Sequence, residues 1–267
     1  MNRQFIAKHW YASVYEQFEN HTNDIEFLLK VLRTQTDGSP QKILEVACGG
    51  GRISVPLAQA GHNVTGFDAD HHMLLRCYRR MRDIPNIKCY QSDALDAGWG
   101  ENFDVVVMAG NILINIESDM DYEYAQRAFI RNASAALRVG GRLYLDYDQH
   151  SESSAAKTFN RLAESSYFKG TDDMGTTGRT VSLGGAYDPV TRIWTGIGHW
   201  ELTTNNGEKF IYGGKPRYKH IPALRQVYGW LSESGFAVEK TYRNYTDEPI
   251  SDDEPDYVKA VIWAAKI

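Results

Sequence analysis

The chain has 267 residues, a formal net charge of -5 and a hydrophobic fraction of 42%. This length can bury the core of one large domain, or of one domain with a small subdomain. The net negative charge disfavours broad binding to nucleic-acid phosphates. No stretch approaches the roughly 18 apolar residues of a membrane span, and the first residues lack the apolar core of a signal peptide. We therefore expect a cytoplasmic protein with no nucleic-acid or membrane partner.

Three cysteines, Cys48, Cys77 and Cys89, show neither a metal-ligand spacing nor an even count. This pattern predicts free thiols in a reducing compartment. It gives no reason to expect a metal site.

Short apolar runs of β type alternate with helical patterns up to residue 150. The runs cover residues 42–47, 63–68, 86–93, 103–110 and 141–148. Helical spacing separates them, and Gly140 with Gly141 predicts a C-cap at the end of the last helix. This alternation predicts a parallel sheet with helices on both faces.

From about residue 176 the pattern changes to aromatic and β-branched strands. The sequences YDPVTR and TNNGE predict hairpin turns, and hence an antiparallel meander. Residues 221–236 then have helical periodicity, two more strands follow, and residues 246–256 form an acidic loop between those strands. The predicted fold is α/β, with a Rossmann-like, seven-stranded, mostly parallel sheet and a β meander inserted after strand five.

Three domains follow from this pattern: an N-terminal helical cap (1–40), an α/β domain (41–150 and 220–267) and an inserted β-rich substrate or lid subdomain (151–219).

Three consecutive glycines, residues 49–51, separate the first predicted strand from a helix. Such a turn lets a ligand approach the backbone closely, and the helix that follows presents unpaired amides. Neither the dinucleotide fingerprint nor the P-loop pattern fits here. Glu45, at the end of the strand, would repel a pyrophosphate but suits a ligand with an ammonium group and a positive sulfur. By themselves, Glu45 and Asp68 could also cap the helices that follow them.

The stretch LEVACGGGR resembles motif I of the class I S-adenosylmethionine-dependent methyltransferases, with Ala47 in place of the first glycine. VTGFDAD, QSDAL, FDVVVMAGNIL and ALRVGGRLYLD are similar to the later motifs of that family. The resemblance implies S-adenosylmethionine as cofactor. Asp68 would accept the ribose hydroxyls, Asp93 would contact the adenine amino group, and Met73 would lie against adenine. The implied cofactor-binding residues are Glu45, Ala47, Gly49, Gly51, Arg52, Asp68, Ala69, Met73, Asp93, Ala94, Ala109, Gly110 and Tyr15.

The overall layout is similar to the glycine N-methyltransferases and the amino-sugar N-methyltransferases. The shared features are a tyrosine-bearing N-terminal helix, a GNILINI segment and a meander after the fifth strand. Asp148 stands where glycine-methylating enzymes carry an arginine for the substrate carboxylate. An acidic group there disfavours glycine and attracts an amine. The catalytic candidates are Asp148, His150 as a proton acceptor, and Asn111; Asp148 could instead face solvent, and His150 could be incidental.

These features predict an enzyme that methylates a small molecule, through N-methylation of an amine-bearing metabolite. The alternatives are an RNA, DNA or protein methyltransferase, a non-catalytic S-adenosylmethionine-binding protein and, more distantly, a nicotinamide oxidoreductase. The partner expected is a small-molecule methyl acceptor, and aromatic residues of the meander could line its pocket or the interface of a homodimer. The sequence leaves open the acceptor, the pathway, the oligomeric state and the use of a general base.

Overall fold

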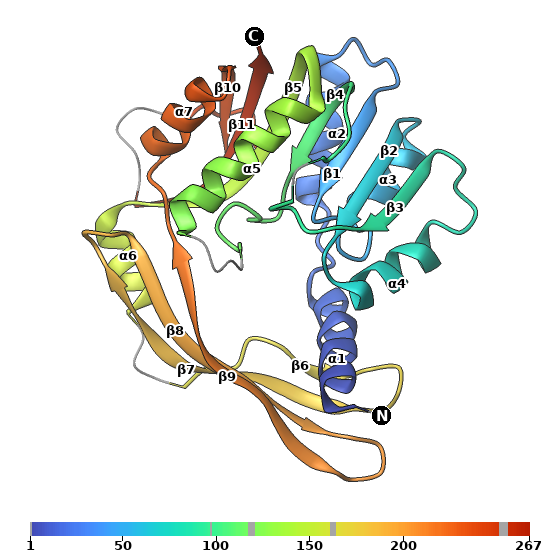
Figure 1. The fold of residues 1–267 in the computed structure, drawn as a ribbon, viewed down its shortest axis with the longest axis vertical. Helices are drawn as coiled ribbons and strands as arrows, with labels where there is room; N and C mark the ends of the chain where they lie inside the picture. Colours follow the sequence, from blue (N-terminus) through green and yellow to red (C-terminus); the bar gives the residue numbers. More distant parts are fainter. Residues whose placement is uncertain (1, 97, 117–120, 161–163, 251–255) are drawn as a thin grey trace. The chain divides into compact units, whose positions relative to one another are not determined.

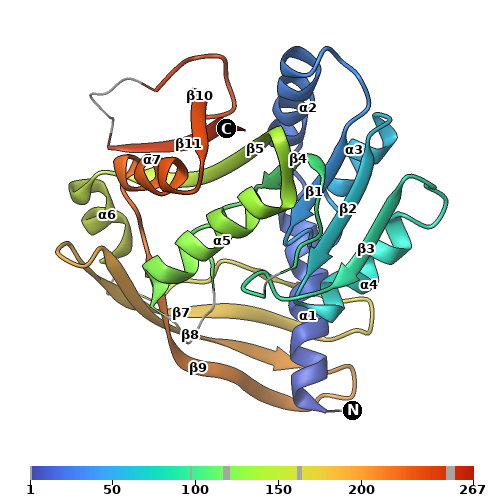
Figure 2. The ribbon, with the colours of Figure 1, turned by 45° about the horizontal axis from the view of Figure 1, so that its top comes forward.

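The computed structural model describes residues 2–96, 98–116, 121–160, 164–250 and 256–267, so residues 251–255 of the predicted acidic loop lie outside the described residues. The chain divides into two compact units. One combines Met1–Asn20 with Glu152–His220, and the other combines His21–Ser151 with Ile221–Ile267. Figures 1 and 2 show the elements of each unit from two directions.

A seven-stranded sheet, with the strand order β10-β11-β5-β4-β1-β2-β3, forms the centre of the larger unit. Its strands are β1 (Lys42–Val46), β2 (Asn63–Asp68), β3 (Ile87–Gln91), β4 (Phe103–Met108), β5 (Leu137–His150), β10 (Phe236–Arg243) and β11 (Tyr257–Lys266). β1 to β5 pair in parallel, whereas β11 pairs antiparallel with both β5 and β10. The predicted seven-stranded, mostly parallel sheet is confirmed.

Helices cover both faces of this sheet, which explains why its central strands are apolar throughout. In β4, Val105 and Val107 pack in one core with residues of two helices, while Val106 and Met108 point to the opposite face, since neighbouring side chains alternate along a strand. The helices are α2 (Asn23–Gln35), α3 (Ser54–Gln59), α4 (His71–Arg80), α5 (Tyr122–Ala136) and α7 (Leu224–Glu233). α2 and α3 belong to the first core, and α5, which packs beside α7, covers β4 and β5 (Figure 2).

The predicted helix C-cap at Gly140 and Gly141 is wrong. Helix α5 ends at Ala136, and β5 begins at Leu137, whose backbone is already extended (φ -79, ψ 145). The register of β5 against β4 shifts just after this point, so the two glycines lie in an irregular stretch of strand. Gly140 has φ 72, and a Cβ at Gly141 would lie 2.9 Å from a backbone oxygen. Glycine is favoured both at an irregularity in a strand and at the C-cap of a helix, so the sequence does not distinguish the two.

The smaller unit contains a four-stranded antiparallel sheet with the order β6-β7-β8-β9. Its elements are α1 (Arg3–Phe18), α6 (Glu152–Phe159), β6 (Lys169–Thr171), β7 (Thr177–Asp188), β8 (Ile193–Thr203) and β9 (Lys209–His220). The turns between β7, β8 and β9 fall on the two predicted hairpins, with Arg192 at φ 56 and Gly207 at φ 85. The predicted meander after the fifth strand is confirmed.

Helix α1 packs against this four-stranded sheet. Trp10 is fully buried, and its Nε1 donates a hydrogen bond to the Gly170 oxygen at 3.0 Å. A Cβ at Gly178 would lie 3.0 Å from the Trp10 ring, so the glycine allows the helix to approach. The two helices of the predicted cap, residues 1–40, therefore lie in different units: α1 packs here, and α2 packs in the core of the larger unit.

Among the described residues, no helix combines the length and the apolar composition that a membrane span requires.

Candidate functional site

The turn after β1 has a backbone that only glycine adopts easily. Gly49 and Gly51 have φ 53 and 78, and Ala47, at the position of the first glycine of the motif, has φ 56. A Cβ at Gly51 would lie 2.9 Å from the Cys77 sulfur, and one at Gly49 would lie 3.3 Å from Met73 Cε. The glycines thus allow the turn to lie close to helix α4.

Asp68, at the end of β2, holds this turn. One oxygen of its carboxylate accepts a hydrogen bond from the Gly49 amide at 2.9 Å, and the other accepts one from the Asp70 amide at 2.7 Å. Burial raises the pKa of Asp68, although both amides act to lower it. Each carboxylate oxygen has a second lone pair, so Asp68 can accept further hydrogen bonds. The next residue, Ala69, accepts a hydrogen bond from Gln91 through its carbonyl oxygen.

Glu45 lies beneath the turn, buried with 4% of its surface exposed. Its carboxylate accepts a hydrogen bond from the Ser54 hydroxyl at the start of α3, which places the carboxylate on the side of the turn. Burial raises the pKa of Glu45 to about 8, although the bond from Ser54 acts to lower it. A bound cation would favour the ionised form, so proton release from Glu45 and cation binding are linked.

Arg52, the last predicted residue of the turn, is held by an ion pair with helix α2. Its two terminal nitrogens donate to the two oxygens of Asp24 at 2.9 and 2.6 Å, and one of them also donates to the His21 oxygen at 3.0 Å. Burial acts to raise the pKa of Asp24, but the hydrogen bonds and charge of Arg52 lower it overall. Arg52 therefore fixes the turn to α2 in this structure.

Asp93 and Ala94 follow β3 at the same edge of the sheet. Asp93 is exposed and accepts a hydrogen bond from the Leu95 amide at 2.8 Å, and Ala94 accepts one from the Trp99 ring nitrogen at 3.1 Å. The alternative structural role of Asp93, capping its own turn, is therefore present in the geometry. The bond from Leu95 reaches Oδ1 of this carboxylate.

The ends of β4 and β5 are joined through Asp146, which the sequence did not single out. Asp146 is fully buried, and its Oδ1 accepts hydrogen bonds from the amides of Gly110 and Asn111 at 2.9 and 3.2 Å. Its Oδ2 is also buried and has no hydrogen-bond partner among the residues that the structure describes. Burial raises the pKa of Asp146 to about 6, despite the charge of Lys259. Asp146 thereby shapes the segment Ala109 to Asn111.

Asp148 and Asn111 form a reciprocal pair. Asn111 Nδ2 donates to Asp148 Oδ2 at 2.7 Å, and the Asp148 amide donates to Asn111 Oδ1 at 2.7 Å. Lys259 Nζ lies 2.7 Å from Asp148 Oδ1 and donates to Asn111 Oδ1 at 2.9 Å. The carboxylate of Asp148 is therefore ion-paired, and its attraction for a cation is weaker than the sequence alone suggests.

His150 lies two residues along β5 from Asp148 and is buried, with 5% exposed. Residues two apart share one face of a strand. Its ring lies 4.9 Å from that of Tyr257, whose hydroxyl donates to Asp148 Oδ1 at 3.0 Å. The three catalytic candidates are thus brought to one region, with Tyr257 and Lys259 of β11 beside them.

Tyr15 belongs to the smaller unit, where its ring packs 6.0 Å from Tyr11 and 5.8 Å from Phe168. Its contact with a cofactor stays a prediction.

Sequence reasoning missed Ser54, Asp24, Asp146, Tyr257 and Lys259. Lys259 offered a signal, since it is a charged residue in the middle of the apolar run YVKAVIWAAK.

Residues 43–141 match a family model described as "Methyltransferase domain". The protein YqeM of Bacillus subtilis is 23% identical over 256 residues, which cover 94% of this chain and 95% of that one. The glycine N-methyltransferase of Rattus norvegicus is 26% identical over 116 residues, 40% of each chain.

Three solved structures share the fold over nearly the whole chain. A methyltransferase from Clostridium acetobutylicum superposes with a TM-score of 0.71 at 12% identity and covers 99% of both chains. The amino pentose methyltransferase CalS10 from Micromonospora echinaspora has a TM-score of 0.64 at 14% identity and covers 100% of this chain and 98% of its own. The sugar N-methyltransferase KedS8 from Streptoalloteichus has a TM-score of 0.66 at 16% identity, and the match covers 94% of this chain and 90% of KedS8.

Proposed function

We propose that this chain, which belongs to the S-adenosylmethionine-dependent methyltransferases, transfers a methyl group to the nitrogen of an amine-bearing small molecule. Two neighbours in fold, CalS10 and KedS8, are named as an amino pentose methyltransferase and a sugar N-methyltransferase, and a relative in sequence over 40% of the chain is a glycine N-methyltransferase. The observation that carries the proposal is the gathering of four carboxylates on three strands of one sheet: Glu45 on β1, Asp68 on β2, and Asp146 with Asp148 on β5.

The residues at the ends of β1 and β2 suit S-adenosylmethionine, which supplies a methyl group on a positively charged sulfur. Glu45 offers a buried carboxylate beneath the glycine turn, whose backbone a ligand can approach closely. Asp68 retains lone pairs for the ribose hydroxyls while it holds Gly49. Met73, beside Gly49, offers an apolar surface for adenine, and Asp93 with Ala94 lies next along the same edge of the sheet.

The residues at the ends of β4 and β5 suit an amine. Asp146 and Asp148 carry two negative charges when ionised, against one positive charge on Lys259, so the cluster keeps a net negative charge. Such a cluster favours a cationic or hydrogen-bond-donating acceptor over a carboxylate. Asn111 orients Asp148 by donating to it and accepting from its amide.

The transfer needs a neutral nitrogen aligned with the methyl carbon. The nitrogen lone pair forms the new bond to carbon while the carbon–sulfur bond breaks and its electron pair stays on sulfur. The nitrogen then carries a positive charge and loses one proton. In this proposal Asp148 holds the N–H group and His150 accepts the proton, because an imidazole exchanges protons near neutral pH.

The experiment is a transfer assay with methyl-labelled S-adenosylmethionine and an extract divided into small molecules, RNA and protein. The proposal expects label in the small-molecule fraction, on nitrogen by mass spectrometry. Label in the RNA or protein fraction would instead support a macromolecular methyltransferase, and donor binding without transfer to any fraction would support a non-catalytic binding protein. The roles of the inserted sheet as a substrate or lid subdomain, and of a homodimer, stay predictions.

A further inference from the structure

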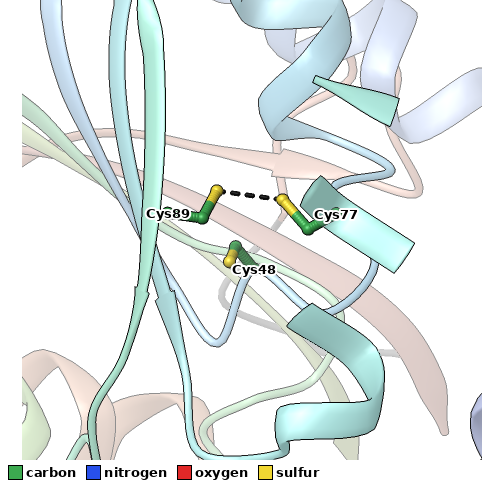
Figure 3. Close-up of side chains that lie close together, drawn as sticks. All are labelled: Cys48, Cys77 and Cys89. Carbon is green, nitrogen blue, oxygen red and sulfur yellow. Dashed lines mark hydrogen bonds between the residues drawn. The ribbon is translucent and has the colours of Figure 1, made fainter. Parts of the chain in front are cut away.

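The fold brings together the three cysteines of the chain, although their spacing in the sequence shows no ligand pattern. The sulfur atoms of Cys48, Cys77 and Cys89 all lie within 4.8 Å of one another, and those of Cys77 and Cys89 lie 2.9 Å apart. Figure 3 shows the sulfurs of Cys77 and Cys89 pointing toward one another, with Cys48 next to them. The residues come from three elements: the turn after β1, helix α4 and strand β3.

We propose that Cys48, Cys77 and Cys89 form a binding site for one thiophilic d10 metal ion, such as Zn²⁺ or Cd²⁺, held by three sulfur atoms. Thiolates are the ligands that such ions prefer. With metal–sulfur distances of about 2.3 Å, the sulfurs of a planar three-coordinate site lie about 4.0 Å apart. This spacing lies within the observed limit of 4.8 Å, and the sulfurs of Cys77 and Cys89 would separate by about 1 Å to reach it.

Two glycines make room for the sulfurs. A Cβ at Gly66 would lie 2.9 Å from the Cys48 sulfur, and a Cβ at Gly51 would lie 2.9 Å from the Cys77 sulfur. Cys48 and Cys77 are buried, with 4% and 0% of their surface exposed, so water does not compete strongly for an ion there. Among the described residues, no fourth cysteine, histidine or carboxylate joins the group, which favours three-coordinate binding.

The electrostatics suit a divalent ion. Three thiolates and a divalent ion carry one net negative charge. Arg80, on the same helix as Cys77, supplies a positive charge nearby and donates a hydrogen bond to the Gly50 oxygen at 3.2 Å. Because the ion binds thiolates, its binding would release protons from the thiols.

The alternative is three ordinary buried thiols that pack as small apolar side chains. The test uses the full chain, stripped of metal with a chelator and kept reduced, and titrates it with Cd²⁺ alone. The proposal expects one Cd²⁺ per chain with a sulfur-to-metal charge-transfer band, and three sulfur neighbours by X-ray absorption. It also expects Cd²⁺ to raise the unfolding temperature, because the ion binds the folded state.

The single variants Cys48→Ser, Cys77→Ser and Cys89→Ser should each weaken Cd²⁺ binding about 100-fold or more, since even partners outside the ligand shell cost about 10- to 100-fold. Leu74→Val, a change of a fully buried side chain on the same helix, is the control and should bind Cd²⁺ as the unchanged chain does. If a serine variant does not fold, the X-ray absorption of the unchanged chain decides. No Cd²⁺ binding, Cd²⁺ without sulfur neighbours, or a disulfide between Cys77 and Cys89 that persists in reductant would overturn the proposal.

Discussion

Lys259 Nζ lies 2.7 Å from Asp148 Oδ1 and joins the antiparallel strand β11 to the end of β5. The two residues face one another in the strand register, although 110 positions separate them in the chain. Both side chains are largely buried, with 15% and 23% exposed, so the pair is screened less than a surface ion pair. It fixes the carboxylate that we propose to hold the acceptor nitrogen.

Replacing Lys259 by methionine removes this charge and leaves Asp148 without its ion pair. We expect turnover to fall about 100-fold, the cost of misplacing a positioned group, with donor affinity within twofold of the parent. Lys266→Met is the control, because Lys266 lies on the same strand but bonds the oxygens of Ser134 and Leu137 at its far end. Equal turnover in K259M and K266M would show that Lys259 has no role in the transfer.

Asp148→Asn keeps the size of the side chain and removes its charge. Turnover of an amine should fall about 100-fold, the cost of misplacing the acceptor nitrogen, while donor affinity measured by calorimetry stays intact. Asp83→Asn, the same change at an exposed residue, is the control. A D148N variant that methylates the same amine at the parental rate would show that Asp148 has no such role.

Asp68→Ala should weaken S-adenosylmethionine binding by about 1 to 3 kcal/mol, the loss expected for charge-assisted hydrogen bonds. Asp70→Ala is the control, since Asp70 caps helix α4 by accepting from the His72 amide at 2.8 Å and lies two residues away. D70A should lower stability by about 1 kcal/mol and leave donor affinity intact. Unchanged affinity in D68A, measured by calorimetry, would show that Asp68 does not bind the donor.

Glu45→Gln tests the buried carboxylate through the pH dependence of stability. Burial raises the pKa of Glu45 from 4.5 to about 8, so the folded state holds the proton more tightly than the unfolded state. The free energy of unfolding of the parent chain should therefore fall as pH rises from about 4.5 to 8. Glutamine does not titrate and can still accept the hydrogen bond from Ser54. The free energy of unfolding of E45Q, relative to that of the parent, should therefore rise by about 3 to 5 kcal/mol over this pH range.

Urea unfolding at pH 5 and pH 8 measures this difference, with the exposed Glu101→Gln as control. E45Q should also bind the donor more weakly, because it lacks the charge that complements an ammonium or a sulfonium. If E45Q and the parent lose the same stability between the two pH values, Glu45 does not titrate as proposed.

Much of the fold was predictable because local pattern determines it. The strand over residues 63–68 was predicted with its bounds, since its apolar run ends at a turn residue on both sides. The end of α5 was not, because a glycine pair fits a helix cap and an irregular strand equally well. The two N-terminal helices follow one another in the sequence, and tertiary packing assigns α1 and α2 to different units.

The parts of the site that come from residues close together in the sequence were predictable. The parts that form only when distant strands and helices meet were not. The turn glycines, Glu45 and Asp68 lie within one strand–turn–helix–strand segment. The pairs Arg52 with Asp24 and Asp148 with Lys259 arise because strands and helices distant in sequence meet in the fold. The three cysteines meet for the same reason, and no spacing rule could have shown it.

The central claim is that the turn at Gly49 to Gly51 binds S-adenosylmethionine together with Glu45 and Asp68. A crystal structure of the chain grown with this cofactor tests the claim most directly. We predict that the ribose hydroxyls lie within hydrogen-bond distance of the Asp68 carboxylate and that the methionine part lies over the turn above Glu45. A cofactor bound elsewhere, or contacts that leave out both carboxylates, would contradict it.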